Sequence, residues 1–299
     1  MKRHIATLLA LAVITPFSFC QNAGKSWSDL DYAGDGHVSH RLDIHLPAEE
    51  KAAYPVVVVI YGSAWFANNM KQMAFNAMGK PLLDAGFAVV AINHRSSGDA
   101  PYPAQINDVK AAIRFLRANK ATYALDDAFI GITGFSSGGH LASLAGATNG
   151  VSTFTKGAFT IDVEGNVGPY VGVSSAVNAV VDWFGPIDLL KMDACERAKT
   201  GQSPEAALVA GSLVDKADLV AMANPITFLD KQDPVFLVIH GEADNVVPPC
   251  QSALFAAALQ EVQRLDAYVT VPDGQHGPVT FNPETFKRMV DFFKANATN

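Results

Sequence analysis

The residues best suited to chemistry lie in the segment Gly134–Gly138, whose sequence is Gly-Phe-Ser-Ser-Gly. An apolar run at 128–133, typical of a buried strand, precedes it, and Leu141–Ala145, typical of the start of a helix, follows it. A Gly-x-Ser-x-Gly sequence between a strand and a helix is the context of a nucleophile elbow, a tight turn that exposes the serine hydroxyl. The glycines are needed because a Cβ in so tight a turn would meet the neighbouring backbone. We therefore expect Ser136 to be a nucleophile.

Two later segments supply the partners that such a serine needs. Asp244 lies in a Gly-x-x-Asp-x-x-Val-Pro turn after an apolar run at 235–239, and His276 lies between two glycines after a run at 267–271. In a catalytic triad the histidine takes the proton of the serine, and the acid orients the histidine. The order serine, acid, histidine along the chain is that of the α/β-hydrolase fold. Weaker alternatives for the acid or the base are Glu242, Asp273, Asp182, Asp188, His94 and His140.

Backbone amides are needed as well, because they stabilise the oxyanion that forms when a serine attacks a carbonyl. The segment 61–65 follows an apolar run and places Ser63 and Ala64 where their amides can serve, provided that φ is negative there. Ser137 supplies a further amide, since it directly follows the nucleophile. We expect these three residues to form an oxyanion hole.

Short apolar runs alternate with helical segments along most of the chain. Runs such as Pro55–Ile60, rich in β-branched residues, are typical of strands buried on both faces of a parallel sheet. The alternation predicts an α/β fold, with a mainly parallel central sheet and helices on both faces. Further strands are expected near 87–92, 128–133, 179–184, 235–239 and 267–271, and helices near 68–86, 106–121, 248–265 and 283–296.

Two longer stretches, 150–178 and 186–228, interrupt this alternation. Stretches of such length are usually lids or binding loops, so we expect lid-like insertions after the nucleophile strand. The segment 37–46 partly alternates apolar and polar residues and is expected to be a half-exposed edge strand. Residues 37–299 are expected to form a single α/β-hydrolase domain. Ligands bind beyond the carboxyl ends of parallel strands, where the segments that carry the candidate residues should meet.

The N-terminal segment has a different character. Residues 1–20 combine a basic start with an apolar stretch, the pattern of a signal peptide, and are too short to span a membrane. They predict export, to the periplasm or the outer membrane of a Gram-negative bacterium, with Cys20 as a possible lipid-attachment site. Residues 21–36 are polar and glycine-rich and are expected to be flexible.

Composition excludes several classes of function. The 299-residue chain has a net charge of −7 and carries no basic cluster, which argues against binding to nucleic acid or to an anionic membrane. Neither zinc-ligand spacing nor a glycine-rich phosphate loop is present, so we expect no metal and no cofactor. The sequence Asp162-x-Glu-x-Asn166 resembles a calcium loop only superficially, because its glycine is misplaced.

Cys195 and Cys250 remain when the first twenty residues are set aside. An exported chain can oxidise them, so we expect a disulfide between these two residues. Two buried free thiols are the alternative.

The sequence resembles bacterial α/β-hydrolase esterases of the feruloyl and acetyl-xylan esterase type. The resemblance is carried by Gly134–His140, Asp244-x-x-Val-Pro248 and Gly274-x-His-Gly277, and it extends over nearly all of residues 35–296. Kynurenine formamidases and hormone-sensitive-lipase-like esterases are further relatives. The resemblance implies a serine esterase in which Ser136, Asp244 and His276 match the triad. One segment departs from the pattern, because those families carry His-Gly-Gly-x-Trp where this chain has Tyr61-Gly-Ser-Ala-Trp65.

Four aromatic residues are predicted at the same edge of the sheet as Ser136, where they would suit a sugar or a phenolic acyl group by stacking, or else belong to the core. They are Trp65, Phe66, Trp183 and Phe184.

Export and the resemblance together imply an enzyme that removes acetyl or feruloyl groups from a plant polysaccharide or oligosaccharide. An arylformamidase, a peptidase with the same triad, and an inactive binding module on this fold are the alternatives. The expected partner is a small-molecule or oligosaccharide ester, with no nucleic acid and no transmembrane span.

Overall fold

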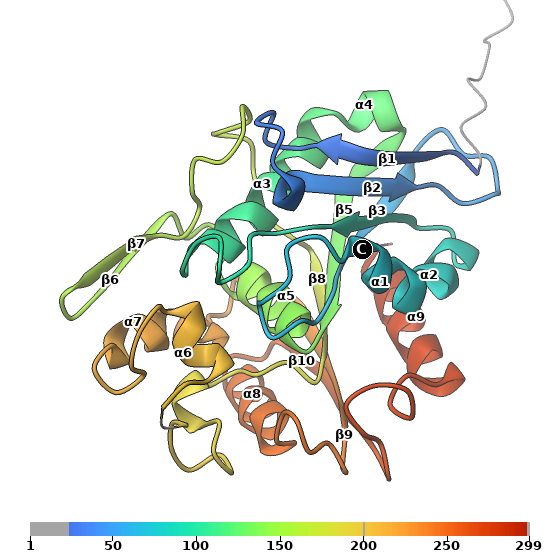
Figure 1. Cartoon of the computed structure of the whole chain (residues 1–299). Coiled ribbons are helices and arrows are strands. Elements are labelled where there is room, and N and C mark those ends of the chain that lie inside the picture. The colour runs from blue at the N-terminus through green and yellow to red at the C-terminus, as the bar shows by residue number, and fades with distance from the viewer. Residues whose placement is uncertain (1–23, 200, 298–299) are drawn as a thin grey trace, which may run out of the picture.

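The computed structural model describes residues 24–199 and 201–297, and Figure 1 shows their arrangement. The signal-peptide pattern at 1–20, including Cys20, lies outside the described residues. The described chain is built on an eight-stranded sheet with the order β1-β2-β4-β3-β5-β8-β9-β10. These strands are β1 (Ser26–Asp31), β2 (Arg41–His45), β3 (Tyr54–Ile60), β4 (Ala88–Ile92), β5 (Leu125–Phe135), β8 (Ala179–Trp183), β9 (Val235–Gly241) and β10 (Leu265–Val271).

From β4 through to β10 all neighbouring strands are parallel, whereas β1 and β2 pair antiparallel with their neighbours. The structure thus confirms the α/β fold with a mainly parallel sheet. The longer helices are α3 (Ala104–Ala118), α5 (Ser137–Ala147), α8 (Cys250–Glu261) and α9 (Pro283–Ala297). Shorter ones are α1 (Lys71–Ala74), α2 (Lys80–Asp84), α4 (Lys120–Tyr123), α6 (Pro204–Leu208) and α7 (Ala217–Met222), with a π-helical turn at Phe75–Gly79 between α1 and α2.

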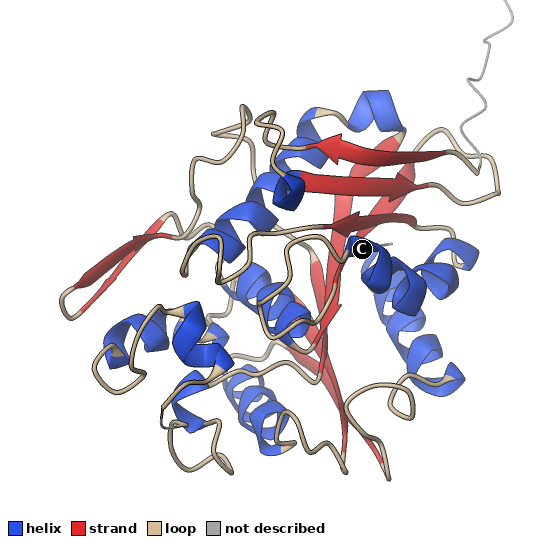
Figure 2. Ribbon diagram, in the orientation of Figure 1, coloured by secondary structure: helices blue, strands red, loops and turns tan. Residues whose placement is uncertain are grey.

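Helices cover both faces of the sheet, as Figure 2 shows. The reason is visible in β3, whose fully buried residues alternate between two separate cores: Val56 and Val58 face one, and Val57 and Val59 face the other. Helices α3, α5 and α8 pack on the first core, and α1, α2 and α9 pack on the second. A strand that must be apolar on both faces reads as a continuous apolar run.

The structure corrects the expected flexible segment at 21–36 over its described part, from residue 24 onward. Residues 26–31 form β1, and Trp27 and Leu30 pair with Ile44 and Leu42 of β2. The register shifts between Trp27 and Leu30, and Asp29 has a φ of 54°. This bulge breaks the period of two by which a strand is recognised in a sequence. Strand β1 therefore forms this edge of the sheet. Strand β2 was expected within 37–46 as an edge strand, but it lies inside the sheet and its three central residues are buried.

The two insertions lie in different places. The first begins after α5 and ends at the start of β8, and its hairpin of β6 (Thr153–Lys156) and β7 (Phe159–Asp162) packs beside α7 (Figure 1). The ring of Phe154 also packs on that of Phe228, beyond the end of α7, with centroids 4.7 Å apart. No residue of 150–178 lines either of the cavities that we describe below. The second insertion follows the carboxyl end of β8 and contains α6 and α7. Of the two insertions, only this second one lines a cavity described below.

No helix within the described residues is long and apolar enough to cross a membrane.

Candidate active site

Ser136 lies in the turn between β5 and α5, with a φ of 56° and a ψ of −127°. Such a strained conformation persists only where the surroundings enforce it. Its neighbours leave no space for side chains, because a Cβ on Gly134 would lie 2.3 Å from the carbonyl oxygen of Gly138, and one on Gly138 would lie 2.4 Å from that of Ile60. The N–H of Ser136 donates to the carbonyl of Trp183 (2.9 Å). The geometry is that of a nucleophile elbow.

Asp244 and His276 meet at the same edge of the sheet, from the loops after β9 and β10. The Nδ1 of His276 lies 2.7 Å from the Oδ2 of Asp244. The other oxygen of Asp244 accepts hydrogen bonds from the amides of Val246 (2.8 Å) and Val247 (3.0 Å). The structure therefore brings together Asp244 and His276, which the sequence predicts as acid and base.

The carboxyl of Asp244 is buried, and burial alone would raise its pKa. The hydrogen bonds from His240, His276 and the Val246 amide outweigh burial and hold the pKa of Asp244 well below its usual range. An ionised carboxylate accepts hydrogen bonds only, so Nδ1 of His276 carries a proton and its Nε2 is free to accept one.

Ser136 and His276 line one cavity of about 290 Å³, which we call the Ser136 pocket. Gly62, Ser63 and Ala64 line it from the side of β3. Three phenyl rings form an apolar part of the wall, and the sequence analysis singled out only one of them. They belong to Phe135, Phe184 and Phe281.

Residues 61–67, which we call the Tyr61 loop, pass close to Ser136. A Cβ on Gly62 would lie 2.7 Å from the Cβ of Ser136, so only glycine permits this approach. The N–H of Ser63 donates to the Oγ of Ser137 (2.9 Å). The amide of Ser137 belongs to the first turn of α5, where N–H groups lack partners within the helix and attract negative charge. All three amides expected for an oxyanion hole thus belong to segments at the Ser136 pocket.

The expectation of a negative φ is wrong for Ala64, whose φ is 50°, and Trp65 follows with 60°. The two left-handed residues form a tight turn, which the hydrogen bond from the N–H of Phe66 to the carbonyl of Ser63 (3.0 Å) closes. The geometry of this turn depends on tertiary contacts that a motif comparison does not include.

Those contacts centre on Ala67. The hydroxyl of Tyr61 donates to the carbonyl of Ala67 (3.1 Å), and the N–H of Ala67 donates to the Oγ of Ser63 (3.3 Å). The Tyr61 ring also stacks on His94, with centroids 4.9 Å apart and planes 12° from parallel. Sequence reasoning noted Tyr61 as a departure from the family pattern but did not find this role.

Trp65 and Trp183 are not available to a substrate, because they are 1% and 0% exposed. The Trp65 indole donates to Nδ1 of His140 (3.3 Å), whose Nε2 lies 2.8 Å from the carbonyl of Ala223. Burial lowers the pKa of His140 to about 4, and both of its ring nitrogens have hydrogen-bond partners in the core, so neither is free to take a proton from Ser136. Both tryptophans were expected as possible substrate contacts, and the structure corrects this to core positions.

The two phenylalanines of the expected aromatic group have different roles. Phe184 is buried, lines the Ser136 pocket, and lies against His276 with ring centroids 4.7 Å apart. Phe66 is 57% exposed and points away to a second cavity.

Cys195 and Cys250 form a disulfide, with their Cα atoms 6.1 Å apart. It connects the second insertion to the first residue of α8. The pairing expected from the sequence is present in the structure.

Comparison with known proteins identifies a family model and similar esterases. A family model described as BD-FAE matches residues 42–259. The chain is similar to the esterase LipQ of Mycobacterium tuberculosis, with 32% identity over 256 residues that cover 83% of this chain and 56% of LipQ. The chain spans about half the length of the curated relatives that it matches.

Two solved structures resemble it closely. One is a bifunctional GH43-CE of Bacteroides eggerthii, with a TM-score of 0.90 and 63% identity, covering 91% of this chain and 35% of that one. The other is a truncated form of a carbohydrate esterase from gut microbiota, with a TM-score of 0.91 and 51% identity, covering 93% of this chain and 98% of that one.

Proposed function

The chain belongs to the BD-FAE family of α/β-hydrolase esterases, and from this membership we propose that it hydrolyses carboxylic esters through a triad of Ser136, Asp244 and His276. The observation that carries the proposal is the 2.7 Å contact between His276 and Asp244, with Ser136 and His276 on one pocket. A histidine held in one tautomer at the same pocket as a half-buried serine is the arrangement that acyl transfer needs.

In the proposed reaction, Nε2 of His276 takes the proton of Ser136 as the serine oxygen attacks the ester carbonyl. Asp244 stabilises the imidazolium that results. The substrate carbonyl oxygen replaces the Ser137 hydroxyl as acceptor of the Ser63 N–H, and the amide of Ser137 supplies the second donor of the oxyanion hole. The left-handed φ of Ala64 removes its amide from this set. His276 then returns the proton to the alcohol as the ester bond breaks. Water, activated by the same histidine, releases the acid from Ser136.

We further propose that the acyl group is acetyl or feruloyl and that the alcohol belongs to a plant polysaccharide or oligosaccharide. The likeness to carbohydrate esterases supports this substrate class. The phenyl rings of Phe135, Phe184 and Phe281 give the Ser136 pocket an apolar wall, which suits the acyl part of the ester.

Export is part of the proposal. The pattern of residues 1–20 and a disulfide, which persists in oxidising compartments, support a periplasmic or outer-membrane location with Cys20 as a possible anchor. Cell fractionation and the mass of the mature N-terminus test it, and an intact N-terminus in the cytoplasm contradicts it.

Labelling with a fluorophosphonate probe tests the triad. The wild-type protein should react at Ser136 and hydrolyse p-nitrophenyl acetate, and Ser136→Ala should do neither. Ser174→Ala, which changes an exposed serine in the first insertion, is the matched control and should behave as wild type. A wild-type protein that stays unlabelled would be a binding module, and one that prefers N-formylkynurenine or a peptide to every ester would be an amidase.

A further inference from the structure

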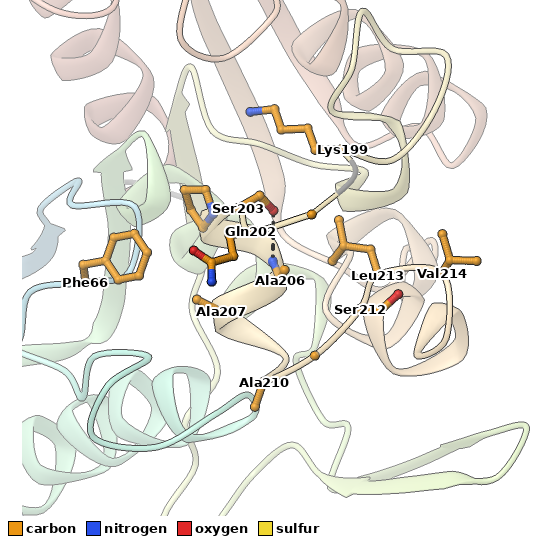
Figure 3. A pocket seen from close by; sticks show the side chains of 13 residues that line it. Phe66, Lys199, Gln202, Ser203, Ala206, Ala207, Ala210, Ser212, Leu213 and Val214 are labelled. Atoms are coloured by element: carbon orange, nitrogen blue, oxygen red, sulfur yellow. Dashed lines mark hydrogen bonds between the residues drawn. The ribbon is translucent and has the colours of Figure 1, made fainter.

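A second cavity, of about 810 Å³, lies around α6, and we call it the α6 cavity. Figure 3 shows Phe66 on one side of α6 and Leu213 and Val214 on the other, with Ala206 and Ala207 on the helix between them. Among the described residues that line this cavity, all but Phe66 belong to the second insertion. Its volume lies within the range of small-molecule sites and is nearly three times that of the Ser136 pocket.

The Tyr61 loop separates the two cavities. Ser63 and Ala64 line the Ser136 pocket, and Phe66, two residues further on, lines the α6 cavity. The hydrogen bond from the N–H of Phe66 to the carbonyl of Ser63 places both sides of the loop in one turn. A molecule in the α6 cavity would therefore lie next to the residues that are proposed to hold the oxyanion.

The chemistry of the α6 cavity differs from that of the Ser136 pocket. Phe66 offers a ring that is 57% exposed, and the alanines of α6 form a smooth apolar floor. Gln202 adds an amide, and Lys199 adds an ammonium group whose Nζ lies 3.7 Å from Oε1 of Glu205 on α6 (Figure 3). None of the described lining residues is acidic. An aromatic face with a few polar groups around it suits a sugar ring, whose C–H face is apolar and whose hydroxyls need partners.

We propose that the α6 cavity is the subsite for the saccharide part of the ester, with Phe66 as the surface on which a sugar ring stacks. This inference rests on the proposed esterase function. The acyl group enters the phenyl-walled Ser136 pocket, and the glycan that carries it extends over the Tyr61 loop to α6. Binding of this remote part holds the ester carbonyl at Ser136 and thereby contributes to the rate.

The test compares kcat/KM on an acetylated xylo-oligosaccharide with kcat/KM on p-nitrophenyl acetate, whose leaving group is too short to fill the α6 cavity. Phe66→Ala should lower the ratio of the two values by about tenfold, the order expected for one lost stacking contact. Phe66→Trp should restore the ratio, because the aromatic face returns. Ala207→Trp, which fills the floor, should lower it again. Val171→Ala, at a residue 60% exposed in the first insertion, is the control and should leave both values unchanged.

A ratio that stays at the wild-type value in both Phe66→Ala and Ala207→Trp overturns the inference. Failure of the esterase function is distinguishable, because it would abolish hydrolysis of both substrates by the wild-type protein. In that case, calorimetric titration with unesterified xylotetraose tests whether the α6 cavity binds a saccharide, independently of any hydrolysis. We expect xylotetraose to bind the wild-type protein and to bind Phe66→Ala about tenfold more weakly. Equal heats of binding for the two proteins would overturn the inference.

Discussion

The hydroxyl of Tyr61 donates a hydrogen bond of 3.1 Å to the carbonyl of Ala67, six residues along the chain. The N–H of the same Ala67 donates to the hydroxyl of Ser63. Tyr61 and Ser63 are the two positions at which this segment departs from His-Gly-Gly-x-Trp. Both departures thus form hydrogen bonds to one residue, and together they hold the loop whose Ser63 amide is proposed to bind the oxyanion.

We expect Tyr61→Phe and Ser63→Ala each to lower kcat by about three- to tenfold, the effect of one lost hydrogen bond. The Michaelis constant should change little, since the oxyanion forms only in the transition state. The double variant should lose more than the product of the two single effects, because either bond alone still holds Ala67. Steady-state kinetics with p-nitrophenyl acetate provide the measurement.

Tyr54→Phe is the matched control for this loop. It also removes a bond from a buried tyrosine hydroxyl to a backbone carbonyl, that of Glu49, but in the loop before β3. It should leave kcat unchanged. A double variant of Tyr61 and Ser63 with wild-type kcat would contradict the bracing role.

The variant Asp244→Asn tests the proposed role of Asp244 as the acid of the triad. The amide cannot hold the tautomer of His276 that leaves Nε2 free, so kcat should fall by about four orders of magnitude while the fold is kept. Asp273→Asn is the control, because Asp273 is exposed and lies three residues before His276. A large loss of activity in Asp273→Asn together with an active Asp244→Asn would show that Asp273, and not Asp244, is the acid.

Asp182 predicts a pH dependence of stability. Burial raises the pKa of its carboxyl to about 7, and its Oδ2 has no hydrogen-bond partner within the described structure. Between about pH 4, its pKa in an unfolded chain, and pH 7, the folded state binds a proton that the unfolded state has lost. The free energy of unfolding therefore falls as pH rises through this range.

Asp182→Asn should lose this dependence, since an amide does not titrate and its oxygen can still accept from the N–H of Gly185 (3.0 Å). Urea unfolding at pH 5 and pH 8 gives the comparison. The wild-type protein should lose more stability than the variant between the two values. Asp233, whose pKa burial also raises to about 7, titrates in both proteins and does not disturb the comparison. Equal losses would show that Asp182 is ionised in the folded state at pH 5.

Removal of the disulfide by Cys195→Ser and Cys250→Ser should lower the free energy of unfolding by roughly 2–4 kcal/mol, because the bond closes a long loop of the unfolded chain. The two cysteines are separated by 55 residues. Reduction of the wild-type protein should have a similar effect, which serves as the control. Two thiols that react with a labelling reagent in the unreduced mature protein would show that the bond does not form.

Much of the fold and the candidate triad could be predicted from the sequence, because these features depend on short-range patterns. Buried strands such as β3 read as apolar runs, since both of their faces meet helices. Gly-x-Ser-x-Gly specifies its own turn. Asp244 and His276 could be paired with Ser136 because the carboxyl ends of parallel strands meet at one edge.

What only the tertiary structure decided depends on contacts between segments that are distant in the sequence. Strand β1 was not predicted, because the bulge at Asp29 interrupts its alternating pattern. Pairing with β2, and not a local pattern, stabilises this strand. Trp65 and Trp183 looked available at a strand end, but packing buries both. Tertiary packing likewise determines the hydrogen bonds that Tyr61 and Ser63 form with Ala67. It also determines the position of α6 near Phe66. An amino-acid pattern along one segment specifies the backbone conformation of that segment, whereas side-chain partners are specified by the packing of the whole chain.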